Sequence, residues 1–291
     1  MSVRALMHTV HTRTASDGAG VRLRRSLGQT AAARLDPFLL LDEFASDNPD
    51  DYIAGFPAHP HRGFETLTYL IEGRMRHEDH LGHRGELVSG GAQWMSAGRG
   101  IIHSEMPLQE RGRLHGFQLW INLPAREKMK PAAYRDITPD MIPEADLDGG
   151  AHVRLIAGRL ELTEDESIVG PVRGLSTELW FVDIALLAGG RFEHHVNPGH
   201  NGLAYPFAGG IMVGPDENAR LLGPQQAGIL GDGDRVVLRA HAGPARCLLL
   251  AARPLNEPIV QHGPFVMNTQ AEIEQAMRDF RLGALTDPPR Q

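Results

Sequence analysis

Short runs of alternating or wholly apolar residues, separated by turn residues, repeat along most of the chain. The run ETLTYLIEG at 65–73 alternates large apolar residues with threonine and ends at a glycine. Similar runs are bounded by charged or glycine-rich turns, namely VRLRRSL at 21–27, DPFLLLDEF at 36–44 and LHGFQLWINL at 114–123. Runs of this length and bounding predict β-strands of a largely buried antiparallel sheet.

The second half of the chain repeats this organisation. A proline-rich, charged stretch at 124–150 separates the halves, and such a shift in composition marks a domain boundary. Strand-like runs resume at residue 151 with the spacing of about 8–12 residues that is typical of small barrels. We therefore expect an all-β protein with two antiparallel β-barrels: a first barrel at 1–130, a linker at 131–150, a second barrel at 151–256 and a tail at 257–291.

The tail contains the clearest helical pattern in the chain. Thr269 and Glu272 have the spacing of a capping box, and Gly283 provides a stop. An apolar stripe lies between them at Ile273, Ala276, Met277 and Phe280. The pattern predicts a C-terminal helix that packs on a barrel through this stripe.

Composition and charge narrow the range of functions. The 291 residues carry a net charge of −7, which does not favour direct binding to DNA or RNA. The one basic cluster, Arg22, Arg24 and Arg25, fits the solvated face of a strand. The only cysteine, Cys247, lies in an apolar run and is expected in a core. With neither a signal-peptide pattern nor a run of about 20 apolar residues, we expect a cytoplasmic protein without a membrane partner.

Two closely spaced pairs of residues carry candidate chemistry. His59 and His61 are separated by one residue, as are His103 and Glu105. On an extended strand such residues project from one face, so two strands would converge as three imidazoles and one carboxylate. This donor set suits a divalent transition ion with positions left open for water, oxygen or substrate.

The alternative is a pair of hydrogen-bonded core histidines, because 15 histidines give a His-x-His pair on the order of once by chance. Pro60 favours an edge strand or a bulge, and Gly63 permits a kink. A bulge there would turn Glu65 toward the site as an acceptor that orients a ligating imidazole. We rank Glu105 above Glu65 as a ligand, since Glu105 shares a strand face with His103.

Other polar positions are weaker candidates. The hairpin at 74–87 carries His77, His80 and His83, which we interpret as an exposed hairpin and not as a second metal site. Adjacent His194 and His195 fall on opposite strand faces, so we expect the second barrel to hold no metal. Gln118 and Trp120 share a strand face that would either line a substrate cavity or pack within the protein.

The whole chain resembles the pirin family of bicupin proteins. The resemblance is carried by VRLRRSLG, DPFLLLDEF, GFPAHPHRGFETLTYLIEG, QWMSAGRGIIHSEMP, LWINLP and QHGPFVMNT, and it is looser over residues 160–240. It implies a double-stranded β-helix fold in each barrel. It also implies that His59, His61, His103 and Glu105 are the metal ligands and that Glu65 is not a primary ligand.

The resemblance implies two classes of function. Some pirins resemble quercetin 2,3-dioxygenases, which open the central ring of a flavonol with O₂ at a metal ion. Here that ion would be Fe(II), although Mn, Ni, Cu, Co or Zn also fits the donor set. Glu105 would then accept the proton of the flavonol 3-hydroxyl. Other pirins are described as redox-sensing regulators that bind a transcription factor or a metabolic enzyme, so a protein partner is the alternative to a small aromatic substrate.

Overall fold

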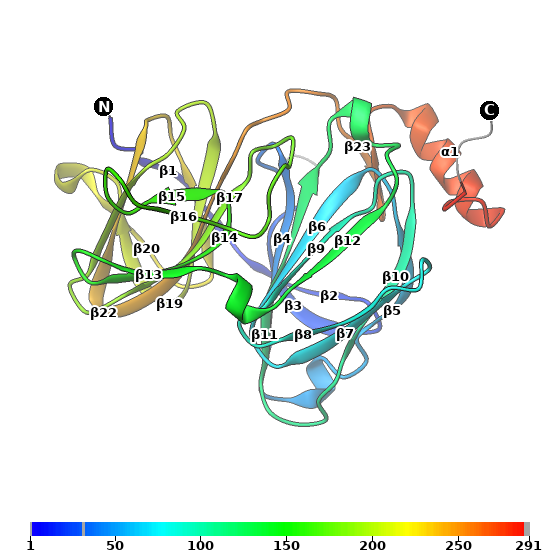
Figure 1. The fold of residues 1–291 in the computed structure, drawn as a ribbon, viewed down its shortest axis with the longest axis horizontal. Helices are drawn as coiled ribbons and strands as arrows, with labels where there is room; N and C mark the ends of the chain where they lie inside the picture. Colours follow the sequence, from blue (N-terminus) through cyan, green and yellow to red (C-terminus); the bar gives the residue numbers. More distant parts are fainter. Residues whose placement is uncertain (1, 31–32, 288–291) are drawn as a thin grey trace. The chain divides into compact units, whose positions relative to one another are not determined.

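In the computed structural model, residues 2–30 and 33–287 are described, and the chain forms two compact units. The first barrel consists of residues 13–139 together with the segment from residue 255 onward. The second barrel consists of residues 140–254 together with the N-terminal residues up to 12. Almost all regular structure is β, with one α-helix near the C-terminus (Figure 1). The predicted all-β, two-barrel fold is confirmed.

The first barrel contains two antiparallel sheets. The larger has the order β12-β9-β6-β11-β4-β3-β2 and the smaller the order β5-β10-β7-β8. The strands of the larger sheet are β2 (Arg13–Asp17), β3 (Val21–Leu27), β4 (Phe38–Ser46), β6 (Phe64–Glu72), β9 (Ala92–Ser96), β11 (Leu114–Asn122) and β12 (Ala133–Ile137). Those of the smaller are β5 (Phe56–His61), β7 (Arg74–Asp79), β8 (Arg84–Val88) and β10 (Ile101–Pro107). Short 3₁₀ turns lie at η1 (Pro49–Asp51) and η2 (Ala125–Glu127).

Apolar side chains hold the two sheets of the first barrel together. Leu23, Phe44 and Leu70 of the larger sheet pack in one buried cluster with Met75 and Leu87 of the smaller. The predicted strand at 65–73 is β6, which lies between β9 and β11 in the sheet and is buried on both faces over most of its length. Central strands of this kind read as near-continuous apolar runs, which is why the sequence pattern located them.

The second barrel is built on one nine-stranded sheet. Its path is β1-β21-β19-β22-β17-β14-β13, with β18 paired to β22 and β20 to β19. The strands are β1 (Leu6–His11), β13 (Glu144–Leu147), β14 (Ala151–Ala157), β17 (Trp180–Leu186), β18 (Arg191–His195), β19 (Asn201–Val213), β20 (Arg220–Leu222), β21 (Gln226–Leu230) and β22 (Arg235–Ala252). A separate pair is β15 (Arg159–Glu161) with β16 (Ser167–Val169), and 3₁₀ turns lie at η3 (Pro139–Met141) and η4 (Asp216–Asn218).

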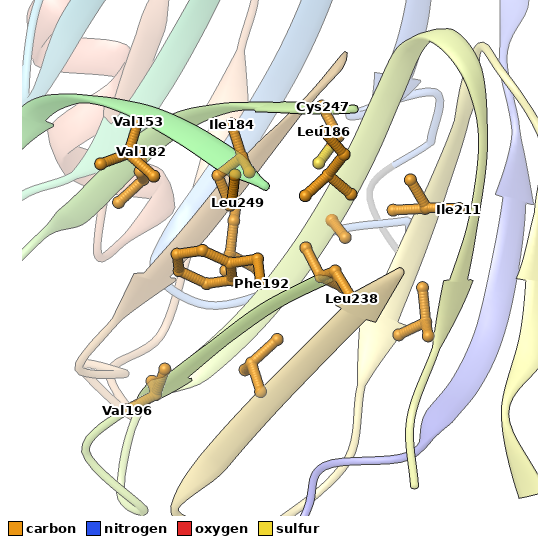
Figure 2. Close-up of a cluster of buried hydrophobic side chains, with 14 of the residues drawn as sticks. Val153, Val182, Ile184, Leu186, Phe192, Val196, Ile211, Leu238, Cys247 and Leu249 are labelled. Carbon is orange, nitrogen blue, oxygen red and sulfur yellow. The ribbon is translucent and has the colours of Figure 1, made fainter. Parts of the chain in front are cut away.

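The interior of the second barrel is apolar. Figure 2 shows Phe192, Leu238 and Leu249 among the side chains that fill it. Cys247 belongs to the same cluster and is fully buried, as expected for a small core residue. Burial raises the pKa of its thiol, so the group is held in its neutral form.

The observed division of the chain differs from the predicted boundaries at three places. Residues 6–11 form β1, which pairs with β21 in the second barrel and not with the first. Residues 133–137 do not form a linker, because β12 pairs with β9 along its whole length. The segment from 255 belongs to the first barrel. Strand pairing depends on contacts between residues far apart in sequence, which composition does not reveal.

The C-terminal segment contains β23 (Val260–His262), β24 (Phe265–Met267) and α1 (Gln270–Arg281). The predicted capping box is confirmed, since the Thr269 side chain accepts from the Glu272 backbone N–H and the Glu272 carboxylate accepts from the Thr269 N–H. Ile273 and Ala276 of the predicted stripe pack in one buried cluster with Phe265 and Met267. Among residues 2–30 and 33–287, no helix is long and apolar enough to cross a membrane.

Candidate metal centre

Three imidazoles converge inside the first barrel. His59 and His61 lie on β5, and His103 lies on the neighbouring β10, directly opposite His59 in the antiparallel register. One nitrogen from each ring lies within 4.8 Å of the others. The ring centroids are 4.4 to 4.9 Å apart. The sequence interpretation therefore located all three imidazoles of the group.

Local backbone features at Pro60 and Gly63 shape the region around His59 and His61. β5 is an edge strand, which tolerates the missing N–H of Pro60. Gly63, two residues after His61, has φ +87°. A Cβ atom at Gly63 would lie 2.0 Å from the Val266 carbonyl oxygen, so only glycine allows the C-terminal segment to approach this closely.

The imidazoles have the chemical state that a metal ion requires. The Pro57 carbonyl can only accept, so His59 donates from Nδ1 over 2.8 Å, and Nε2 is the nitrogen of this ring that could bind an ion. His61 Nδ1 and His103 Nε2 are buried with no hydrogen-bond partner among the described residues. Burial, together with the neighbouring rings, holds the pKa values of His61 and His103 well below the usual range. Neutral, unpartnered imidazole nitrogens fit a divalent transition ion.

Glu105 occupies a different position from the three histidines. The β5–β10 register shifts between His103 and Glu105, so Glu105 pairs with Phe56. The group whose ligand atoms all lie within 4.8 Å of one another does not include its carboxylate. The carboxylate is buried and accepts from Thr68 Oγ1 at 3.2 Å and from Gln118 Nε2 at 3.1 Å. These bonds fix its orientation on the wall of the same cavity.

A cavity of about 760 Å³ opens beside the imidazoles. His59, His61, Glu105, Gln118 and Trp120 all line it, so Gln118 and Trp120 face a cavity and are not merely packed. The Trp120 ring lies 5.2 Å from that of His61. The remaining wall is largely apolar and includes Leu23, Leu39, Leu40, Phe44 and Phe56. Such a cavity has the size and lining of a site for a small organic molecule.

His77 is a site residue that sequence reasoning missed. We expected an exposed hairpin, which holds for His80 and His83 but is wrong for His77. His77 is buried on β7, next to β10, and its Nδ1 lies 3.4 Å from His103 Nδ1. Its ring stacks on Tyr134 at 4.4 Å. Met75, an apolar residue two positions before His77 and on the same strand face, was the available signal that this face is buried.

Glu65 does not join the imidazoles. Its buried carboxylate pairs with Lys130 Nζ at 3.0 Å. Burial raises its pKa, partly offset by Lys130. The basic cluster also differs from expectation at one residue, because Arg25 is not on a solvated face. It donates to Asp42 and Asp17 and lines the cavity.

Arg62, between His61 and Gly63, ties the C-terminal segment to the site. Its guanidinium is buried and donates to Asp279 of α1 at 2.7 Å and to the Leu285 carbonyl at 2.9 Å. Its backbone pairs with Phe265, and the adjoining Pro264 lines the cavity. Residues far apart in sequence therefore close one wall of the site.

The second barrel has no comparable group of potential metal ligands among its described residues. Within residues 2–30 and 33–287, the three-imidazole group is the one cluster of at least three potential ligands. His194 stacks on Trp180, and burial lowers its pKa to about 4. His195 is exposed.

Two family models match the chain: Pirin over residues 20–121 and the Pirin C-terminal cupin domain over residues 181–286. The chain belongs to the pirin family. Its pirin relatives include a Pseudomonas aeruginosa protein named "Putative quercetin 2,3-dioxygenase", which is 53% identical over 96% of each chain. Pirin from Homo sapiens is 42% identical over 94% of this chain and 91% of its own.

A solved structure shares the pirin fold seen here. A crystal structure of quercetin 2,3-dioxygenase from Acinetobacter baumannii has a TM-score of 0.87 at 33% identity, covering 98% of this chain and 99% of that one. The end-to-end match agrees with the resemblance read from the sequence motifs. The bicupin architecture expected of a pirin is thereby confirmed.

Proposed function

We propose that this pirin is a metal-dependent dioxygenase that opens the ring of a flavonol of the quercetin type with O₂. The observation that carries the proposal is the group of three converging imidazoles, of which those of His61 and His103 are buried, beside a mainly apolar cavity with a carboxylate on its wall. The names of two similar proteins, from Pseudomonas aeruginosa and Acinetobacter baumannii, support the same reaction class. A regulator without catalysis would need no cavity of this size.

In this proposal His59, His61 and His103 hold the ion, with Glu105 as the fourth ligand. Fe(II) is the ion we favour, and Mn, Ni, Cu, Co or Zn would also suit the donors. When bound, such an ion supplies Lewis acidity toward a hydroxyl oxygen and a site for oxygen chemistry. The protein contributes a fixed geometry, since His59 is oriented by the Pro57 carbonyl and His103 by contact with His77.

Glu105 has the additional role of a proton acceptor. One carboxylate oxygen accepts from Gln118 Nε2, and the other shares the single Thr68 hydroxyl proton with Gln118 Oε1, at 3.2 and 2.8 Å respectively. This network holds the carboxylate at the cavity wall, where it meets the hydroxyl of a bound flavonol. Removal of that proton makes the ring electron-rich, which the reaction with O₂ requires.

The cavity walls suit a flat aromatic substrate. Trp120 and Phe56 offer ring faces, and the leucines exclude water from the fused rings. Expulsion of water also strengthens the interaction between Glu105 and the substrate hydroxyl.

The test is turnover by protein purified without oxygen and loaded with Fe(II). Mixed with quercetin in air, it should consume O₂ and bleach the flavonol absorbance, and His103→Ala should lose both signals. Glu105→Gln keeps the shape but cannot accept a proton, so turnover per bound ion should fall by roughly 10²–10⁴-fold. Bound iron is measured for each variant, so that a lost ion is not mistaken for lost basicity.

The regulatory alternative makes the opposite prediction. Wild-type protein that is verified as Fe(II)-loaded but does not turn over quercetin or related flavonols would contradict the dioxygenase. A change in affinity for a protein partner between the ferrous and ferric forms would then be the function to test.

A further inference from the structure

One cation in the cavity wall has no anionic partner. Arg34 lines the cavity and donates from Nη2 to Gln261 Oε1, also on the wall. Its Nε is buried and makes no hydrogen bond within the described part of the chain. No carboxylate of those residues lies within ion-pair distance of it. A half-buried guanidinium in this state retains unused donors on a residue that lines the cavity.

The other charged groups on the wall are already satisfied. Arg25 donates to both oxygens of Asp42, at 2.9 and 2.6 Å, and to Asp17 at 3.0 Å. Glu105 accepts from Thr68 and Gln118. Of the two arginines among the described lining residues, Arg25 is therefore balanced by carboxylates and Arg34 is not. Burial without a compensating charge lowers its pKa, in contrast to Arg25, whose pKa the two carboxylates raise.

We infer that Arg34 binds a carboxylate carried by the substrate, so the cavity is built for an aromatic acid in preference to a neutral flavonol. The apolar rings and leucines accommodate the aromatic body, while the guanidinium offers donors in a fork that matches a carboxylate. Gln261 holds the guanidinium in place, because its own Nε2 donates to the Gly263 carbonyl at 3.3 Å. The inference rests on the proposed function for the location of the substrate.

Binding can be measured separately from turnover. Full-length protein loaded with Zn(II), which does not react with O₂, is titrated with 3-hydroxyflavones that carry a carboxylate at position 4′, 6 or 7. Each acid is compared with its own methyl ester, which has the same rings without the charge. Quenching of tryptophan fluorescence reports the Kd. We expect at least one acid to bind about 10- to 100-fold more tightly than its ester.

The variants assign that preference to Arg34. Arg34→Gln should weaken binding of the acid to the level of the ester, while binding of the ester changes by less than about twofold. Arg34→Lys keeps the charge but not the fork, so it should retain part of the preference. Arg22→Gln is the matched control, since Arg22 is an exposed arginine of β3 that does not line the cavity.

Three results would overturn the inference. One is equal binding of every acid and its ester by the wild type. Another is a preference that survives Arg34→Gln. The last is an equal loss for acid and ester together with a lower melting temperature, which would make Arg34 a structural link to Gln261. If Arg34→Gln does not fold, the comparison of acid with ester in the wild type and in Arg34→Lys still tests the inference. Failure of flavonol turnover leaves these binding results unchanged, so the two proposals fail separately.

Discussion

The two barrels share a β architecture but fill it differently. Of the buried polar or charged residues in the described chain, 16 lie in the first barrel and 3 in the second. The interior of the second barrel is a single large apolar cluster that includes Phe192, Leu238 and Leu249 (Figure 2). The first barrel instead has imidazoles, carboxylates and amides facing a cavity.

This difference shows where the fold is stabilised and where it carries chemistry. Burying apolar groups stabilises a barrel, whereas each buried polar group costs free energy unless it is paired. The first barrel accepts that cost at residues such as His61 and His103, each of which has a buried nitrogen with no hydrogen-bond partner among the described residues. A polar interior with a cavity therefore marks the first barrel as the location of the candidate site. The apolar interior of the second barrel indicates a structural role.

The largest difference between the two barrels should appear in metal retention when one of the proposed metal-binding histidines is replaced. His103→Ala should abolish metal retention, taking a stoichiometry of about one ion per chain to nearly none after dialysis, because two imidazoles and a carboxylate hold an ion far less tightly. Circular dichroism should show an intact fold. His195→Ala, on an exposed residue of the second barrel, is the control. Full occupancy in His103→Ala, or about two ions in the wild type, would contradict the division of roles.

Deletion of a core ring should have the converse effect. Phe192 is 1% exposed, so Phe192→Ala should lower the free energy of unfolding by about 3–5 kcal/mol through lost burial and a residual cavity. Metal bound per folded chain should not change. Urea unfolding and metal analysis measure the two quantities. Leu187→Ala, at a residue 68% exposed in the same barrel, should cost less than about 0.5 kcal/mol.

A buried lysine tests whether the polar interior of the first barrel must be fully paired. Lys128 donates to Gly63 O and Asn122 Oδ1, both at 2.6 Å, and to Val266 O at 3.0 Å. Lys128→Met leaves three acceptors unpaired and should cost about 2–4 kcal/mol in urea unfolding. Unchanged stability would show that an apolar residue serves equally well there.

The same lysine should give a pH signature. Burial lowers its pKa from 10.5 to about 7 in the folded protein. Between these values the unfolded chain binds more protons than the folded chain, so this group makes stability rise with pH from about 7 to about 10.5. The rise should be smaller in Lys128→Met. An identical slope in both proteins would assign it to other groups.

His77 provides a smaller test of the same contrast. His77→Phe keeps the ring stacked on Tyr134 but removes the nitrogen beside His103, so metal affinity should fall by about 10- to 100-fold. His77→Gln restores a polar partner and should recover part of the loss. Competition with a chelator measures the affinity. His83→Gln, on the exposed turn, is the control, and equal affinity in His77→Phe would remove His77 from the site.

The smallest expected effect is at the cap of α1. Thr269→Ala removes the acceptor for the Glu272 N–H and should lower the free energy of unfolding by about 1 kcal/mol. Because Asp279 of the same helix binds Arg62, metal affinity should decline slightly as well. Gln270→Ala, exposed and outside the cap, should change neither quantity.

What the sequence revealed was local. The capping box at Thr269, the buried strand at 65–73 and the imidazoles of His59, His61 and His103 all depend on residues within one element or on two strands with a shared face. Their spacing can therefore be recognised in the sequence without knowledge of the fold.

What the sequence did not reveal depends on register and on distant pairing. The bulge that shifts Glu105 relative to His103 has no marker in the run IIHSEMP. His77 lies behind His103 only because β7 is the neighbour of β10. The place of Arg34 in the cavity wall requires the C-terminal segment to return with Gln261. Each of these is a long-range relation that a periodic pattern cannot encode.

The return of the C-terminal segment also sets an order of events during synthesis. A ribosome releases residues 56–107, with all three imidazoles, before it makes residues 140–254 of the second barrel, and it makes the partners of Arg62 only afterwards. The wall at Pro264 is therefore missing from a nascent chain whose histidines have already emerged. The cavity wall and the contacts of Arg62 are complete only after translation has passed residue 285. A protease that cuts between 255 and 264 would open this wall without touching His59, His61 or His103.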